Sequence, residues 1–269
     1  MRLSTRFSTT AKWLKHGVSA TCLGASLLIA QAASATTVQF QTVMGDFEVN
    51  LFDKTTPETV KNFLAYVNAN AYENTFIHRS VPGFIVQGGG FAFNGDYPIE
   101  NITQNAKVTN EPVYSNLRGT IAMAKLGSDA NSATNQWFFN LSDNSANLDK
   151  QNGGFTVFGQ VTGNGMAIVD AMAALGRFNM GNAFTSIPLR NYTAEDNTNK
   201  VEVTDEHFVL IQNIVVLNAD PDTAASLNPP KNTLITKKDD DGGSGSMGLF
   251  SLLMLGLLAL GRKSLLNRK

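Results

Sequence analysis

Apolar and polar residues alternate in the first two extended segments of the chain. In residues 38–43 and again in residues 47–51, apolar side chains occupy every second position over most of the segment. This is the period of a half-buried β-strand. Met44-Gly45-Asp46 lies between the two segments, and a glycine between two such runs is typical of a hairpin turn. The pattern therefore predicts a β-hairpin.

A helical period follows the hairpin. Val60, Phe63, Leu64 and Val67 recur at intervals of three and four residues, which places them on one face of a helix. Thr55-Thr56-Pro57 precedes them and supplies a capping residue type and a proline suited to the first helical turn. We expect an amphipathic helix whose apolar face packs on the core.

Short apolar runs separated by Gly, Asn and Asp fill most of the remaining middle of the chain. They predict strands at residues 75–78, 84–87, 119–123, 136–139, 157–161 and 208–217. A second amphipathic helix is expected at residues 166–175. Many short strands with two helices indicate a β-barrel or a β-sandwich closed by helices. Residues 176–205 are polar and irregular and predict a long loop.

The N-terminal end differs in composition from the middle of the chain. Residues 1–35 contain four basic residues and no acidic ones, an apolar run at 18–30, and an A-x-A site at Ala33-Ser34-Ala35. These features are the signature of a secretory signal peptide. We expect signal peptidase to cut between Ala35 and Thr36 and the mature chain to function outside the cytoplasm.

The C-terminal end predicts a linker and a short apolar helix. Residues 219–246 contain prolines, an acidic run and Gly-Gly-Ser, and predict a disordered linker after the domain at 36–218. The predicted apolar helix and its basic end span residues 247–269. Residues 247–260 are apolar except for one serine, and Arg262-Lys263 follows them. As a helix this run rises about 21 Å, less than the ~30 Å hydrocarbon core of a bilayer.

Two interpretations of this tail are open. It could be a short membrane anchor with its basic flank on the cytoplasmic side, and it would then be the only part of the chain to meet a membrane. Gly-Gly-Ser, a short apolar helix and a basic end also resemble the GlyGly-CTERM sorting tails of Gram-negative bacteria. That resemblance implies cleavage by a rhomboid-like sorting protease, and we favour it.

Charge and residue usage exclude several classes of function. Residues 36–243 contain 13 basic and 22 acidic residues, a net charge of −9, although the whole chain sums to −1. Nucleic-acid-binding domains normally need a basic face. The single cysteine, Cys22, lies in the predicted signal peptide, so the domain has no disulfide and no cysteine nucleophile. His78 and His207 do not form a zinc motif, and we expect neither a metal nor an organic cofactor.

One dense stretch carries a long motif. Residues 76–89 read FIHRSVPGFIVQGG and match F-x-H-R-x-x-x-x-F-x-x-Q-G-G at each fixed position. This resembles the cyclophilin family of peptidyl-prolyl cis-trans isomerases. Blocks at residues 118–124, 131–140 and 147–159 agree in order and spacing with the bacterial periplasmic branch, so the resemblance covers about residues 37–218. It implies an eight-stranded antiparallel β-barrel capped by two α-helices, with the site on the outer wall.

The chemistry of such a site can be argued without the family. Rotation about a peptide bond crosses a barrier of ~18–20 kcal/mol, and X–Pro exchange takes roughly tens to hundreds of seconds. In the twisted transition state resonance is lost and the prolyl nitrogen becomes a hydrogen-bond acceptor. A fixed donor aimed at this nitrogen binds the twisted state better than either planar state. Arginine is always protonated and has a planar fork of donors. Arg79 is therefore the predicted catalytic donor, and a surface salt-bridge arginine is the alternative.

The resemblance implies roles for the other motif residues. Phe84 and Gln87 complete the predicted catalytic set with Arg79, and Gln87 binds the substrate backbone and positions the arginine. The predicted substrate-binding residues match pocket or groove positions of the family: His78, Ile85, Ala124, Lys125, Gln136, Phe138, Leu148 and Phe155. The apolar members would hold the proline ring, and ordinary core packing is their alternative role. The backbone of Ala124 and Lys125 would receive the residue before proline. His78 would support the site, because the reaction transfers no proton.

Four positions depart from the common family pattern. Asn147 stands where many members have Trp, Phe155 where the best-known members have His, Lys125 where Asn is common, and Trp137 where Phe is usual. The missing Trp contributes to cyclosporin binding in the family, so the resemblance implies weak inhibition by cyclosporin.

The leading hypothesis is an exported prolyl isomerase that acts on proline-containing unfolded polypeptides. Its expected place is the periplasm or cell envelope of a Gram-negative bacterium, or the cell surface or medium after tail processing. Two other classes remain open. One is a binding or holdase module with a cyclophilin fold and little turnover. The other is a surface-displayed interaction protein, suggested by the acidic domain and the tail.

Overall fold

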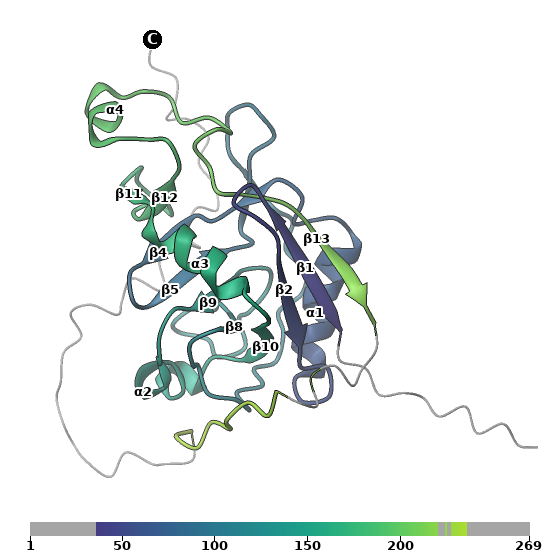
Figure 1. Cartoon of the computed structure of the whole chain (residues 1–269). Helices are drawn as coiled ribbons and strands as arrows, with labels where there is room; N and C mark the ends of the chain where they lie inside the picture. Colours follow the sequence, from purple (N-terminus) through teal and green to yellow (C-terminus); the bar gives the residue numbers. More distant parts are fainter. Residues whose placement is uncertain (1–35, 220–223, 225–226, 236–269) are drawn as a thin grey trace, which may run out of the picture. The chain divides into compact units, whose positions relative to one another are not determined.

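The computed structural model describes residues 36–219, 224 and 227–235 (Figure 1). The predicted signal peptide and the predicted apolar tail at 247–269 lie outside this part of the chain. No helix within the described residues has the length and apolar character needed to cross a membrane.

The described chain is mainly antiparallel β structure, as predicted. Eleven strands share one sheet in the order β4-β5-β9-β8-β10-β2-β1-β13-β3-β6-β7, and β11 pairs separately with β12. The strands are β1 (Thr37–Thr42), β2 (Phe47–Leu51), β3 (Thr75–Phe76), β4 (Arg79–Val81), β5 (Ile85–Gly88), β6 (Phe91–Ala92), β7 (Glu100–Asn101), β8 (Thr120–Met123), β9 (Trp137–Asn140), β10 (Val157–Val161), β11 (Gly176–Phe178), β12 (Ile187–Leu189) and β13 (Leu210–Asn218). The predicted count of eight is too low, because several pairings involve segments of only two or three residues.

The helices are α1 (Pro57–Asn68), α2 (Ser145–Leu148), α3 (Gly165–Ala174) and α4 (Ala194–Asn199), with one 3₁₀ turn, η1 (Gln151–Gly153). The two predicted helices correspond to α1 and α3, while α2 and α4 are too short to give a periodic signal.

The first turn of α1 is capped from a distant loop. Glu111 accepts hydrogen bonds from the Thr59 backbone N–H at 2.9 Å and from its hydroxyl at 2.7 Å, and a carboxylate there also complements the helix dipole.

Aromatic side chains fill the space beneath the predicted hairpin. β1 pairs with β2, and Phe40 lies opposite Phe47 with ring centroids 5.1 Å apart. Trp137 and Phe139 of β9 meet Phe40 edge to face at 5.1 and 5.4 Å. All four side chains are buried. Complete burial of such a side chain contributes roughly 1.5–3 kcal/mol each, so this cluster fixes the sheet that carries the site.

The region predicted as an irregular loop is instead a structured insertion. Residues 176–205 contain β11, β12 and α4, so the prediction is wrong in this respect. The insertion supports a second hydrophobic cluster, whose buried members are Phe76, Phe91, Phe93, Ile187, Leu189, Tyr192, Val203 and Phe208. It also covers the outer edge of β4: Ser80 N–H donates to Ser186 O at 2.8 Å, and Ser186 Oγ donates to Ser80 O at 2.6 Å.

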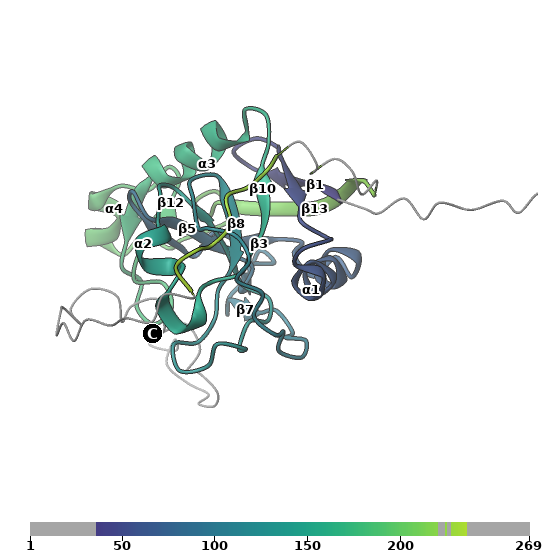
Figure 2. The ribbon, with the colours of Figure 1, turned by 90° about the horizontal axis from the view of Figure 1, so that it is seen from below.

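A segment after β13 lies against the domain near α2 (Figures 1 and 2). Within residues 227–235, Pro230 O accepts from Ser115 N–H at 3.0 Å, and Asn232 Nδ2 donates to Asp149 O at 2.9 Å. The composition predicts disorder throughout the linker, and these residues differ from that prediction. Most of the remaining linker lies outside the described residues.

Candidate active site

Strand alternation brings two kinds of side chain to the two faces of the sheet. On β9, Trp137 and Phe139 point into the main core, while Phe138 belongs to a separate cluster on the other face. On β8, Ile121 and Ala122 divide in the same way. Successive strand residues must point to opposite faces. The sheet therefore carries a second apolar surface outside its main core.

A row of cross-strand neighbours links this apolar surface to Arg79. Arg79 on β4 lies opposite Gln87 on β5, Gln87 lies opposite Phe138 on β9, and Phe138 lies opposite Ala122 on β8. Directly opposite residues have their Cβ atoms about 4.5–5.5 Å apart. The predicted donor and the predicted pocket wall are thus parts of one continuous row.

The apolar part of the site is a compact cluster. Its buried members are Phe52, Ile85, Ala122, Phe138, Leu148, Phe155 and Val157. The partly buried Phe84 and Ala124 pack against it. The rings of Phe138 and Phe155 meet edge to face, with centroids 5.8 Å apart. The structure therefore brings together every apolar side chain predicted for the proline pocket.

A chain of hydrogen bonds forms the polar part of the site. Arg79 Nη1 donates to Gln87 Oε1 at 3.3 Å, and Gln87 Nε2 donates to Gln136 Oε1 at 2.9 Å. The side chain of Gln136 also forms a hydrogen bond with the His78 ring. Arg79 is half-buried, and burial lowers the pKa of its guanidinium from the ordinary value. The guanidinium stays charged at neutral pH and keeps donors that Gln87 does not use.

The His78 ring lies next to Gln136 in this series of hydrogen bonds and is uncharged. Its ring is buried and meets the edge of Phe91 at 4.9 Å. Burial, with a smaller contribution from the positive charge of Arg79, lowers the pKa of His78 from 6.5 to about 3. The ring is therefore uncharged across the physiological range.

This pKa predicts a flat pH profile of activity. We expect kcat/KM to stay constant from about pH 5 to pH 7, because His78 keeps one protonation state there and Lys125 stays protonated. On unfolding, the ring regains a pKa of 6.5 and takes up a proton below that pH. The free energy of unfolding, compared with that of His78→Gln, should therefore fall as the pH drops below 6.5. An activity step centred near pH 6.5 that disappears in His78→Gln would contradict this assignment.

Lys125 braces the pocket wall with its side chain. Its buried ammonium donates to Asn152 O at 2.7 Å and to Gly154 O at 2.5 Å, and lies 4.8 Å from the centroid of the Phe155 ring. Burial lowers its pKa from 10.5 to about 8. The family resemblance implies only a backbone role at this position. The structure adds a side chain that ties Phe155 to the turn before it.

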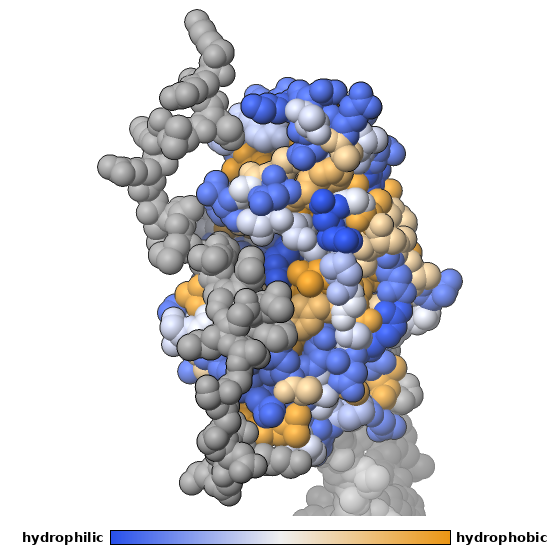
Figure 3. Space-filling model, turned by 90° about the vertical axis from the view of Figure 1, so that its left-hand side faces the viewer, coloured by the Kyte–Doolittle hydropathy of each residue, from blue (hydrophilic) through white to orange (hydrophobic). Residues whose placement is uncertain are grey.

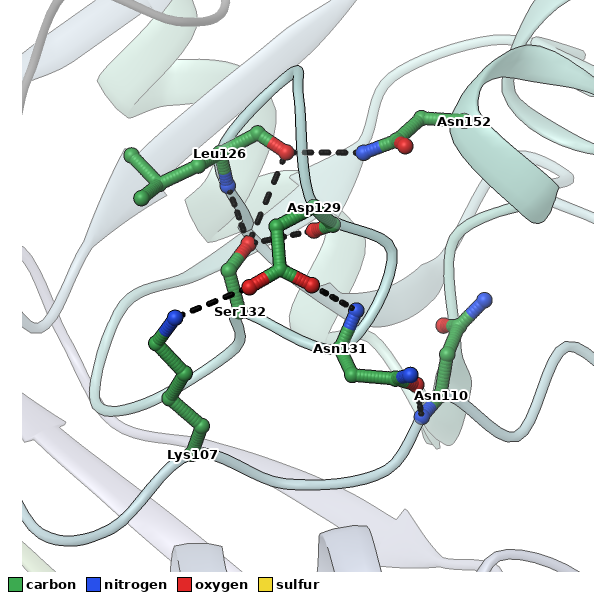
Figure 4. A network of polar contacts seen from close by, with 7 residues as sticks. All are labelled: Lys107, Asn110, Leu126, Asp129, Asn131, Ser132 and Asn152. Carbon is green, nitrogen blue, oxygen red and sulfur yellow. Dashed lines mark hydrogen bonds and ion pairs between the residues drawn. The ribbon is translucent and has the colours of Figure 1, made fainter.

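A second polar network holds the loop that leads into Gln136 (Figure 4). Asp129 pairs with Lys107 at 2.8 Å, and Ser132 Oγ donates to the backbone oxygen of Asp129 at 2.6 Å. Leu126 N–H donates to Ser132 Oγ at 2.6 Å, and Leu126 O accepts from Asn152 Nδ2 at 2.7 Å. The loop is therefore tied to the same turn that Lys125 holds.

Sequence reasoning missed two parts of the site. Phe52 joins the apolar cluster from the end of β2, and no motif marks it. Asn116 fixes the pocket wall from behind: its backbone N–H donates to Asp149 Oδ1 at 2.8 Å, and its Nδ2 donates to Phe155 O at 3.2 Å. The acceptor, Asp149, belongs to the motif block Asn147-Leu148-Asp149. The donor, Asn116, lies 33 residues earlier in the sequence.

The face of the domain that carries α2, α4 and β4 has a mixed surface (Figure 3). Apolar patches lie between polar ones in the middle of this face, so it is not a uniformly charged surface. Within the described residues, no group of three or more His, Cys, Asp or Glu side chains is placed to hold a metal ion.

Comparison with known proteins identifies the family of the chain. A family model described as cyclophilin type peptidyl-prolyl cis-trans isomerase/CLD matches residues 37–194. The chain belongs to this family. All the predicted site residues of this cyclophilin lie within the matched range, and the predicted class of enzyme, a peptidyl-prolyl cis-trans isomerase, is confirmed.

Several bacterial relatives are similar over this range. The peptidyl-prolyl cis-trans isomerase of Acinetobacter baylyi is 39% identical over 157 residues, which cover 56% of this chain and 79% of the relative. Peptidyl-prolyl cis-trans isomerase A of Dickeya dadantii is 40% identical over 159 residues, covering 56% and 77%. A crystal structure of a Cryptosporidium parvum cyclophilin aligns with a TM-score of 0.49 at 23% identity, covering 68% of this chain and 98% of that one.

Proposed function

We propose that this cyclophilin accelerates rotation about X–Pro bonds in exported polypeptides, with Arg79 as the donor to the prolyl nitrogen. The observation that carries this proposal is the row in which Arg79 and Gln87 continue directly into Phe138 and its apolar cluster. A proline ring held against Phe138 would lie beside the side chain of Gln87, whose Oε1 accepts from the Arg79 guanidinium at 3.3 Å. The X–Pro peptide bond that must rotate would then lie next to the Arg79 guanidinium.

Each group has a distinct task in this mechanism. The apolar cluster binds the proline ring equally well in both planar states and in the twisted state, so it holds the substrate without selecting a state. Arg79 acts when the nitrogen lone pair becomes available, because only the twisted state offers that acceptor. Gln87 holds the guanidinium through its Oε1 and is itself held by Gln136. This preorganised arrangement avoids reorienting a donor during the reaction.

The test is the refolding of a denatured exported protein whose slow phase is set by an X–Pro bond. Substoichiometric amounts of this cyclophilin should accelerate that phase and leave the fast phase unchanged. A holdase or binding module would need stoichiometric amounts and would slow refolding. Acceleration that persists in Arg79→Ala would contradict the assigned donor.

Export is proposed from the two ends of the chain. Residues 1–35 have the composition of a signal peptide, and residues 247–269 resemble a GlyGly-CTERM tail. We place the domain in the periplasm or beyond, as in the periplasmic branch that the motif blocks resemble. Fractionation of a Gram-negative host, with mass analysis of both termini, tests the location, the cut between Ala35 and Thr36, and the removal of the tail.

The substitution at the pocket rim predicts weak cyclosporin binding. Asn147 is half-buried and has a short polar side chain, so a large apolar ligand gains little contact from it. Asn147→Trp should strengthen cyclosporin binding by about tenfold or more, because an aromatic side chain adds buried contact area at an interface. Isothermal titration calorimetry measures both affinities. Nanomolar binding by the unaltered chain would contradict the prediction.

A further inference from the structure

The first residue of the described domain is held by a carboxylate. Thr36 is only 5% exposed. Its backbone nitrogen donates to Asp53 Oδ2 at 2.7 Å, and its hydroxyl donates to Asp53 Oδ1 at 3.0 Å. Its carbonyl accepts from Leu51 N–H at 2.9 Å. Every polar group of Thr36 is thus engaged at the end of β2, and its nitrogen has one defined position.

Asp53 is set up as an acceptor at that position. Burial raises the pKa of its carboxyl, and hydrogen bonds from the Thr36 backbone, the Thr36 hydroxyl and its own backbone act against that rise. The ion pairs formed within the described residues, Lys107–Asp129 and Arg118–Asp170, do not include it. A partly buried carboxylate that accepts only neutral donors would gain more from a charged one.

Cleavage before Thr36 would supply that charge. Hydrolysis of the Ala35–Thr36 peptide bond consumes one water molecule, leaves a carboxylate on Ala35 and converts the Thr36 amide nitrogen into an amine. An α-amine has an ordinary pKa of about 8, so this amine is protonated at neutral pH. The nitrogen that donates at 2.7 Å as an amide would then donate as an ammonium, and charge-assisted hydrogen bonds are roughly twice as strong as neutral ones.

We propose that Asp53 is the receptor for the α-ammonium group that signal-peptide removal creates at Thr36. The inference rests on the proposed cleavage site and adds a structural consequence to it: processing converts a neutral contact into an ion pair and makes the mature domain more stable than its precursor. The contact closes the end of β2 next to Phe52, which belongs to the apolar cluster of the site. The Phe52 backbone N–H continues the closure by donating to Phe158 O at 2.8 Å.

The geometry makes the ion pair specific to one cleavage position. A residue in an extended strand advances about 3.3 Å, so one extra residue would carry the ammonium away from the carboxylate. Cleavage one residue earlier should leave the neutral contact intact but remove the charge from it.

The experiment compares two chains that differ only by Ala35. One begins at Thr36 and the other at Ala35, both run to residue 269, and both are made from fusions that leave the chosen first residue. Each is prepared with Asp53 and with Asp53→Asn, in one detergent and at neutral pH. The Thr36 chain should melt about 2–4 °C higher than the Ala35 chain, and Asp53→Asn should abolish the difference.

Two controls separate this effect from general strain. Asp46→Asn removes an exposed carboxylate from the turn between β1 and β2 and should leave the difference unchanged. If Asp53→Asn does not fold, acetylation of the Thr36 amine in the unaltered chain removes the charge and should lower the melting temperature by the same amount. Equal melting temperatures for the two unaltered chains, or a difference that survives in Asp53→Asn, would overturn the proposal.

The export proposal fails by a different observation. A first residue other than Thr36, found by mass analysis of the chain recovered from a host, would refute the cleavage site. The melting comparison uses chains whose first residue is chosen in advance. It therefore tests the ion pair independently of where the host cleaves the chain.

Discussion

Replacing Arg79 with alanine lowers kcat/KM for a short X–Pro peptide by about 10²–10³-fold, the loss typical for removal of one preorganised donor to a transition state. KM changes little, because the apolar cluster still holds the proline ring. Arg79→Lys keeps the positive charge but loses the planar fork, so its activity stays close to that of the alanine variant. NMR exchange spectroscopy of the peptide measures the rates, and circular dichroism checks the fold.

Arg177→Ala is the matched control for this prediction. Arg177 is exposed on β11, and among the residues that the structure describes it donates only to the backbone oxygens of Ala173 and Leu175, at 3.3 and 3.4 Å. Its loss should leave kcat/KM within about twofold, since exposed charges contribute little. Equal losses in the two variants would mean that net charge, and not the placed donor, governs the rate.

Replacing Gly89 with alanine destabilises the fold by about 2–5 kcal/mol, the sum of a left-handed conformation and overpacking. Gly89 has φ +78°, and a Cβ there would lie 2.6 Å from Trp137 Nε1 and 2.8 Å from Asn135 O. The second contact is with backbone, so the segment that carries Asn135 and Gln136 just before β9 must shift. Urea denaturation measures the loss of stability. Under conditions in which Gly89→Ala remains folded, its activity should be lower than that of the unaltered chain.

Gly83→Ala is the control that separates conformation from space. Gly83 has φ +64°, but nothing lies within 4 Å of a Cβ built there. Only the conformational cost of about 1–2 kcal/mol is expected. If the two variants lost the same stability, the close approach of Gly89 to Trp137 would have no energetic role.

The regular elements could be predicted because their side chains repeat with a clear period. The alternation before and after Gly45 corresponds to β1 and β2, and the apolar face from Val60 to Val67 corresponds to α1. The insertion at 176–205 could not be predicted in this way. Its apolar residues follow neither a period of two nor of 3.6, and they become buried against Phe76, Phe91, Phe93 and Phe208 from other segments.

The motif predicted the residues of the site but not all of their interactions. The order of residues 76–89 places Arg79 and Gln87 opposite each other once a turn joins two strands. The roles of the Lys125 side chain and of Phe52 depend on contacts between distant segments, which local patterns do not contain. The contact between Asn232 and Asp149 is hidden for the same reason, because proline-rich composition signals only the absence of regular structure.

The most direct test of the account is catalysed cis–trans exchange of a short X–Pro peptide by the purified chain. With Arg79 as the donor, exchange should be fast relative to the uncatalysed reaction, which takes roughly tens to hundreds of seconds, and should be lost when Arg79 becomes alanine in a chain that keeps its fold. No acceleration by the folded, unaltered chain would contradict it, and the apolar cluster beside Arg79 would then be a surface that binds proline without turning it over.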